Sequence, residues 1–247
     1  MEKVSVKFLG SGDAFGSGGR FQTCIFVNSS EIGFLLDCGA SSLIAMRRFG
    51  VSPSDVDAIL ITHLHGDHFG GIPFFILDSQ MISRRNNPLL IAGPPGLEER
   101  VQRSMEVQFP GSTQIEQRFP IDFAELPEGV PTRLGALLVT PERVVHASGA
   151  PPYALRVEVA GKTLTFSGDT EWTDSLIKAA SGADLFICES YVYDKEMKFH
   201  IDYQTLINRR KELGCKRLVL THMSKDMLDR LDSLDVEYAE DGKVIAL

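Results

Sequence analysis

The chain has 247 residues, of which 43% are hydrophobic and 23% charged, a balance that is ordinary for a globular protein. A chain of this length can bury a sizeable core, and no linker rich in proline, glycine or serine divides it, so we expect one domain over residues 1–247. The net charge of -8 argues against a polynucleotide substrate, although a local basic patch would still permit one. The first residues lack the apolar stretch of a signal peptide, and no run of about 18 apolar residues follows, so we expect a cytoplasmic protein without membrane contact.

Short apolar runs bounded by turn residues recur along the chain and predict many strands with helices between them. In chain order, the expected strands are Val4–Leu9, Thr23–Val27, Phe34–Asp37, Asp57–Thr62, Leu89–Ala92, Ala136–Thr140, Leu155–Val159, Thr163–Ser167, Leu185–Glu189, Arg217–Thr221, Val236–Ala239 and Val244–Ala246. The expected helices are Ser41–Phe49, an apolar segment over Phe69–Ile82 that packs in the core, Leu97–Val107, Asp174–Ala180 and Tyr203–Leu213. Asp241-Gly242 predicts a type I′ hairpin between the last two strands. This order of elements is typical of sheets whose outer faces are covered by helices.

Four side chains with metal-ligand chemistry fall within six residues at the end of an apolar strand. The segment THLHGDHFGG contains His63, His65, Asp67 and His68. Residues two apart on a strand share a face, so His63 and His65 can point to one side, while the other two follow a turn and can reach a neighbouring point. Imidazoles suit zinc and other late first-row metals, and a carboxylate offsets part of their charge. Because the chain has only six histidines, the cluster indicates a metal site rather than a polar surface loop.

This cluster resembles the H-x-H-x-D-H hallmark of the metallo-β-lactamase fold superfamily, and the resemblance extends over nearly the whole chain. FLGSG at Phe8–Gly12 is similar to the first strand and loop of that fold, and Asp37-Cys38-Gly39 is similar to its D-x-G turn. His146, the SGDT segment with Asp169, and His222 follow in the order of the later ligands of that fold. The resemblance implies the α+β fold class and a four-layer αββα sandwich with the metals at one edge of its two sheets.

The same resemblance implies two divalent metal ions and a ligand set for each. The first ion would be held by His63, His65 and His146, the second by Asp67, His68 and His222, and Asp169 would bridge both. Zinc is the expected metal, with Mn2+ or Fe2+ as alternatives. The two aspartates and a bridging hydroxide would offset most of the charge of the two ions.

Further segments resemble one branch of the superfamily, which contains Z-type transfer-RNA ribonucleases, cyclic phosphodiesterases and arylsulfatases. These segments are GSGDAFGSGGR near the N-terminus and HASGAPPYAL from His146. β-Lactamases of this fold generally lack the aspartate bridge that Asp169 would supply, and they are exported, so antibiotic hydrolysis is not expected. The branch keeps an additional histidine that is not a ligand, matched here by His200. His200 is the expected general acid, and Glu189 would orient and charge its imidazole.

The sequence therefore predicts a metal-dependent hydrolase, most specifically a phosphodiesterase that cleaves a small or short phosphodiester with a metal-bridging hydroxide oriented by Asp67. Many Z-type ribonucleases carry a long arm between the positions of His146 and Asp169, whereas only 22 residues separate them here, which favours a small ester over nucleic acid. The alternatives are an arylsulfatase, a lactonase, a Z-type ribonuclease acting at the 3′ end of transfer RNA, and a binding protein that kept the fold without catalysis. A homodimer is expected by analogy with this branch. Arg20, which follows a glycine-rich loop, is either a phosphate contact or a solvated side chain.

Overall fold

Two mixed sheets of seven strands each form the centre of the computed structural model, which describes residues 4–247. The first sheet has the order β14-β1-β2-β3-β4-β5-β6, and the second has the order β13-β12-β11-β10-β9-β8-β7. The strands are β1 (Ser5–Gly10), β2 (Cys24–Asn28), β3 (Gly33–Leu36), β4 (Ala58–Leu60), β5 (Leu89–Gly93), β6 (Ile121–Glu125), β7 (Thr132–Leu134), β8 (Leu137–Arg143), β9 (Tyr153–Val159), β10 (Lys162–Phe166), β11 (Leu185–Glu189), β12 (Leu218–Thr221), β13 (Glu237–Tyr238) and β14 (Val244–Ala246). The helices are α1 (Ser42–Arg48), α2 (Gly66–Phe69), α3 (Ile72–Met81), α4 (Leu97–Gln108), α5 (Ser175–Ala180), α6 (Tyr203–Arg209) and α7 (Lys225–Leu228).

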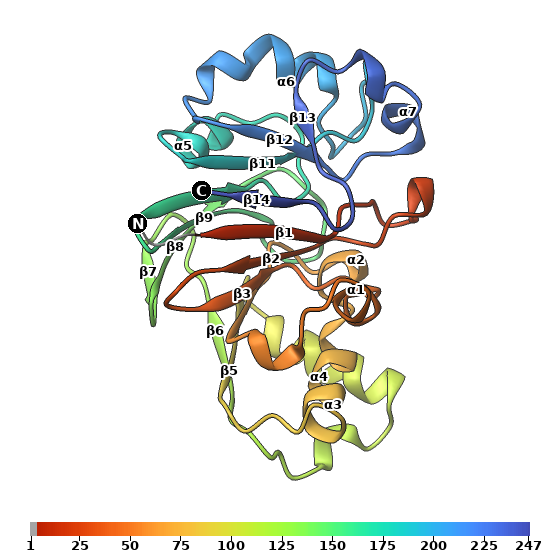
Figure 1. The fold of residues 1–247 in the computed structure, drawn as a ribbon, viewed down its shortest axis with the longest axis vertical. Helices are drawn as coiled ribbons and strands as arrows, with labels where there is room; N and C mark the ends of the chain where they lie inside the picture. Colours follow the sequence, from red (N-terminus) through yellow and green to blue (C-terminus); the bar gives the residue numbers. More distant parts are fainter. Residues whose placement is uncertain (1–3) are drawn as a thin grey trace.

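The alternation of side chains along each strand explains why both faces of the sheets are buried. In β2, Ile25 and Val27 belong to the core between the two sheets, whereas Cys24 and Phe26 belong to the core beneath the first helices. Successive strand residues point to opposite faces, so one strand serves two layers. A third core packs the second sheet against α5, α6 and α7. Figure 1 shows α1–α4 outside the first sheet and α5–α7 outside the second, which confirms the predicted four-layer αββα sandwich.

The predicted hairpin at Asp241-Gly242 is wrong. β13 pairs in parallel with β12 in the second sheet, whereas β14 pairs antiparallel with β1 in the first. The Asp241 carboxylate accepts hydrogen bonds from the Ser11 backbone N–H (2.9 Å), the Ser11 hydroxyl (2.8 Å) and the Phe21 backbone N–H (2.8 Å). These contacts with the N-terminal segment hold the turn where the chain crosses between sheets, so tertiary bonds override the local turn signal.

The structure also differs from the sequence predictions in several elements. β6 and β7 are edge strands whose residues are mostly half-buried or exposed, so they lack a clear apolar alternation. Asp67 and His68 lie on the one-turn helix α2 rather than in a loop. The apolar segment expected over Phe69–Ile82 forms α3, which begins after two glycines.

No helix in the described part of the chain combines the length and the apolarity that crossing a membrane requires.

Candidate metal centre

The predicted site residues lie where strands of both sheets end. His63 follows β4 in the first sheet, whereas Asp169 follows β10 and His222 follows β12 in the second. β10, β11 and β12 are parallel neighbours, as are β3 and β4. The carboxyl ends of parallel strands meet at one edge of a sheet, and the segments that follow them can therefore converge.

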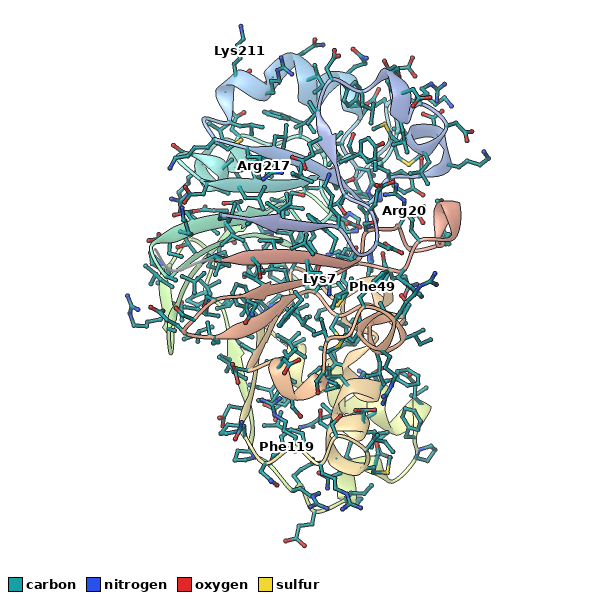
Figure 2. All side chains as sticks on the ribbon, viewed as in Figure 1. Lys7, Arg20, Phe49, Phe119, Lys211 and Arg217 are labelled. Atoms are coloured by element: carbon teal, nitrogen blue, oxygen red, sulfur yellow. The ribbon has the colours of Figure 1, made fainter. Side chains whose placement is uncertain are left out.

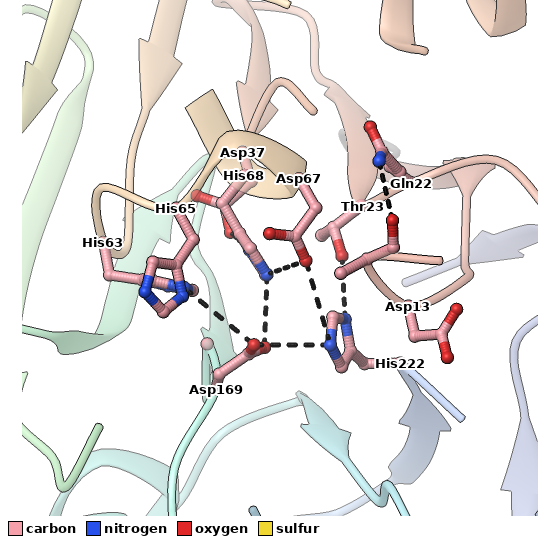
Figure 3. A network of polar contacts seen from close by, with 12 residues as sticks. Asp13, Gln22, Thr23, Asp37, His63, His65, Asp67, His68, Asp169 and His222 are labelled. Atoms are coloured by element: carbon pink, nitrogen blue, oxygen red, sulfur yellow. Dashed lines mark hydrogen bonds and ion pairs between the residues drawn. The ribbon is translucent and has the colours of Figure 1, made fainter. Parts of the chain in front are cut away.

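The structure brings all seven predicted metal-binding residues together in two adjoining groups, and Figure 3 labels six of them, all except His146. Within each group, one potential ligand atom per residue lies within 4.8 Å of the others; the groups are His63, His65 and His146, and Asp67, His68, Asp169 and His222. Asp169 lies between the groups: its Oδ2 is 3.9 Å from Nε2 of both His63 and His146 and 3.3 Å from Nε2 of His222. Its other oxygen, Oδ1, is 3.3 Å from Nε2 of His68. Asp169 is therefore in position to contact both groups.

Protein acceptors hold the Nδ1 nitrogen of four of these histidines and direct the Nε2 nitrogen towards the centre. The acceptors are Thr62 Oγ1 for His63 (3.0 Å), Asp37 Oδ2 for His68 (2.6 Å), the Phe199 carbonyl for His146 (3.0 Å) and Thr23 Oγ1 for His222 (3.3 Å). His65 differs, because its Nδ1 lies 3.0 Å from His146 Nε2. Hydrogen bonds of this kind fix the tautomer and ring orientation that metal-ligating histidines need.

Asp37 is a site residue whose role the sequence reasoning missed, although the D-x-G resemblance pointed to its position. Its buried carboxylate accepts hydrogen bonds from the Thr62 backbone N–H and hydroxyl, both at 2.8 Å, as well as from His68. Burial raises the pKa of Asp37, although the charge of His68 opposes the rise. Asp37 also has a positive φ of 57°, as does His222 with 54°. Such backbone conformations are costly for residues with a Cβ, and they cluster at functional sites.

The electrostatics of the centre fit a bound cation. His63 Nε2, His68 Nε2 and Asp169 Oδ1 are buried without a hydrogen-bond partner, and all three belong to the two groups. Burial lowers the pKa of His63 well below its ordinary value, which leaves a neutral imidazole with a free lone pair. Burial alone would lower the pKa of His68, but the charges of Asp169, Asp67 and Asp37 raise it well above its ordinary value. The position of the His68 imidazole therefore favours a positive charge. Metal ions bind deprotonated ligands at such points, so these residues could hold metal.

A second functional group adjoins the two ligand groups. Glu189 is fully buried at the end of β11, accepts a hydrogen bond from the Thr170 backbone N–H, and lies 3.1 Å from His200 Nδ1. Burial raises the pKa of Glu189 to about 7, although the hydrogen bond from His200 acts to lower it. Burial would lower the pKa of His200, but its hydrogen bond to Glu189 and the charge of that carboxylate raise it to about 9. The His200 ring also stacks on Tyr191, with centroids 4.5 Å apart, and its centroid is 5.2 Å from that of His146.

Arg20 serves the fold. Its guanidinium donates hydrogen bonds to the Ala239 carbonyl (2.6 Å) and to the Ser11 hydroxyl (3.3 Å). Figure 2 shows it beside the C-terminal segment that crosses between the sheets. These contacts give Arg20 a structural role in place of the predicted choice between a phosphate contact and a solvated side chain.

Known proteins match this chain over nearly its whole length. The sequence pattern of a family described as the anti-Pycsar protein Apyc1 matches residues 4–244. A ribonuclease Z of Methanothermobacter thermautotrophicus is 31% identical, and the match covers 90% of this chain and 87% of the ribonuclease. The alignment spans 277 positions, more than the 247 residues of this chain, so the ribonuclease contains residues that this chain lacks.

Solved structures give the same result. The short form of human tRNase Z superposes with a TM-score of 0.80 at 27% identity and covers 98% of each chain. The metallo-β-lactamase fold protein YhfI from Bacillus subtilis superposes with a TM-score of 0.78 at 21% identity and covers 99% of this chain and all of YhfI. These matches confirm the predicted fold, the predicted branch and the prediction of a hydrolase. The chain has the metallo-β-lactamase fold and belongs to the family of the anti-Pycsar protein Apyc1.

Proposed function

We propose that this chain is a dinuclear metal-dependent phosphodiesterase that hydrolyses a small or short phosphodiester. The supporting observation is the convergence of two ligand groups beside His200, a histidine that is hydrogen-bonded to a buried glutamate. Hydrolysis of a phosphodiester requires stabilisation of negative charge on the phosphoryl oxygens and a proton for the departing oxygen. The ligand groups suit the first requirement, and His200 suits the second.

The donor chemistry of both groups supports zinc as the metal. The first group offers three imidazoles, and the second offers two imidazoles with two carboxylates. Imidazole and carboxylate are common zinc ligands, and three protein ligands with an open position are typical of catalytic zinc. Two divalent ions bound by these residues would supply Lewis-acid charge for the phosphoryl oxygens and would lower the pKa of a bound water.

The protein's own side chains would carry the proton transfers. Asp67 lies in the second group with a side chain that is 8% exposed, and we infer that it accepts a hydrogen bond from the attacking water and orients it. His200 keeps Nδ1 on Glu189, so Nε2 is the nitrogen that would donate a proton to the leaving oxygen. Because Glu189 raises the pKa of His200 to about 9, after burial has acted in the opposite direction, the imidazole is protonated at neutral pH.

Two properties of the chain favour a small substrate. The net charge is -8, whereas proteins that grip polynucleotides usually present basic surface. Only β9, β10 and short connections lie between His146 and Asp169, where an arm for transfer RNA would be inserted. Cleavage at the 3′ end of transfer RNA is the second candidate function, and the names of the ribonuclease Z and tRNase Z relatives favour it.

Parallel assays on one metal-loaded preparation test this proposal. Protein stripped by a chelator and reloaded with Zn2+, Mn2+ or Fe2+ is given nitrophenyl phosphodiesters, a nitrophenyl sulfate, a lactone and a precursor transfer RNA. We expect metal-dependent turnover of the phosphodiesters. Faster turnover of the sulfate or the lactone would overturn the choice of substrate class, and efficient cleavage of the precursor would favour the second candidate. Full activity after exhaustive chelation would overturn both.

Other features expected from the sequence stay predictions: the number and identity of the ions, the roles of the individual ligands, the single domain over residues 1–247, the cytoplasmic location and the homodimer.

A further inference from the structure

We propose that Glu171 is a positioning residue, whose carboxylate holds the Phe199 backbone in the conformation that sets both His146 and His200. This inference deepens the proposed function and rests on it. His146 of the first ligand group and His200, the candidate proton donor, are far apart in the sequence, and Phe199 connects them.

Phe199 has an unusual backbone. Its φ is 71°, in the left-handed region that a bulky side chain rarely adopts. Residues stay in this region only where their surroundings hold them there, and such residues concentrate at functional sites. The conformation of Phe199 therefore requires an explanation in its contacts.

Both backbone polar groups of Phe199 are bonded to the site or its support. Its N–H donates to Glu171 Oε1 at 2.8 Å. Its carbonyl oxygen accepts from His146 Nδ1 at 3.0 Å, which leaves His146 Nε2 facing the centre. The next residue is His200, whose Nδ1 is bonded to Glu189. One residue thus links a candidate metal ligand, the candidate acid and Glu171.

The segment around Phe199 is also a turn, in which the His200 N–H donates to the Met197 carbonyl at 3.2 Å. A recess of about 480 Å³ lies against it, lined among others by Glu171, Trp172, Met197 and His200. The Phe199 ring meets the His146 ring edge-on, with centroids 6.0 Å apart. After loss of the Glu171 hydrogen bond, the Met197–His200 turn and the bond to His146 would be left to hold the Phe199 backbone, and the recess gives this segment room to relax to a negative φ.

Glu171 is itself well anchored to the centre. It lies two residues after Asp169, its N–H donates to the Val145 carbonyl at 3.1 Å, and its carbonyl accepts from the Thr170 hydroxyl at 2.6 Å. Val145 directly precedes His146. The Glu171 backbone is therefore fixed to the segments that carry Asp169 and His146, and its side chain extends this frame to Phe199.

The inference predicts two linked effects when the carboxylate is removed. If Phe199 relaxes, its carbonyl moves away from His146 Nδ1, and metal affinity at the first ligand group falls. The same movement displaces His200, so the hydrolysis of esters with poor leaving groups falls more than that of nitrophenyl esters. A residue that only supported overall stability would not couple these two effects.

The experiment titrates metal-free protein with Zn2+ and measures leaving-group dependence in four proteins: wild type, Glu171→Gln, Glu171→Ala and Glu196→Ala. Glutamine keeps an acceptor oxygen for the Phe199 N–H, so Glu171→Gln should stay within about threefold of wild type. Glu171→Ala should weaken one of two zinc equivalents by roughly 10–100-fold, the usual effect of losing an outer partner of a ligand. Glu196 is exposed and lines the same recess, so Glu196→Ala is the matched control and should behave as wild type.

A double variant separates positioning from general damage. Glycine adopts positive φ without penalty and keeps both backbone groups, so adding Phe199→Gly to Glu171→Ala should restore part of the zinc affinity. If Glu171→Ala does not fold, as judged by circular dichroism, Glu171→Asp takes its place, because its shorter side chain withdraws the acceptor. Unchanged zinc affinity and leaving-group dependence in Glu171→Ala, or in Glu171→Asp where it is used instead, would overturn the inference. Failure of the wild type to bind zinc would instead overturn the proposed function.

Discussion

Replacing Glu189 with glutamine should move the pH at which the enzyme loses its general acid. In the wild type, burial opposes protonation of His200, but the hydrogen bond to Glu189 at 3.1 Å and its charge raise the pKa of His200 to about 9. Glutamine keeps an oxygen for the Thr170 N–H but removes the charge. The pKa of His200 should then fall to its ordinary value of about 6.5 or below, which is about 3 kcal/mol less stabilisation of the imidazolium.

The size of the effect follows from the protonated fraction of His200. A general acid works only when protonated, so activity falls as the pH rises through its pKa. At pH 8, a group with a pKa of about 9 is about 90% protonated, whereas one with a pKa of about 6.5 is about 3% protonated. We therefore expect an approximately 30-fold loss of kcat/KM at pH 8 and almost none near pH 5.5. Bound cations would lower the pKa in both enzymes, so the difference between the two profiles is the quantity to measure.

The assay compares the pH dependence of kcat/KM for zinc-loaded wild type and Glu189→Gln on a phosphodiester with an alkyl leaving group. A nitrophenyl diester serves as the comparison, because nitrophenolate departs without a proton and its profile should change little. Glu196→Gln controls for the loss of one negative charge near the site, since Glu196 is exposed and lines the recess beside His200. Superimposable profiles for the alkyl ester, or an equal loss at pH 5.5 and pH 8, would refute the assignment of His200 as an acid charged by Glu189.

Three further substitutions test the centre and the core. Asp37→Asn should weaken metal binding by roughly 10–100-fold, because His68 loses its charged acceptor. Metal analysis after dialysis measures the loss, and a metal content equal to that of the wild type would contradict the prediction. Asp67→Ala should lower kcat by orders of magnitude with the fold intact, as steady-state kinetics and circular dichroism would show, whereas near-normal turnover would remove Asp67 from the mechanism. Phe166→Ala, in the core between the sheets, should lower the free energy of unfolding by about 3–5 kcal/mol in urea denaturation without changing zinc stoichiometry, and a loss below about 1 kcal/mol would contradict the packing.

The sequence by itself determined the features whose signals are local. His63, His65, Asp67 and His68 lie in one short segment, and their residue types state their chemistry before any fold is known. Buried strands need continuous apolar runs between turn residues, which is why β11 has the bounds predicted for it. The order of His146, Asp169 and His222 along the chain also indicated metal ligands, but only through resemblance to a known fold.

Only the tertiary structure decided which distant groups meet. Asp241 is held by Ser11 and Phe21, which lie 230 and 220 residues away, and those bonds divide the last two strands between the sheets. The roles of Asp37 and Glu171 depend on which N–H or imidazole faces their carboxylates. Residue type and periodicity do not encode such pairings, because a hydrogen bond is satisfied by whichever partner the folded chain brings within reach.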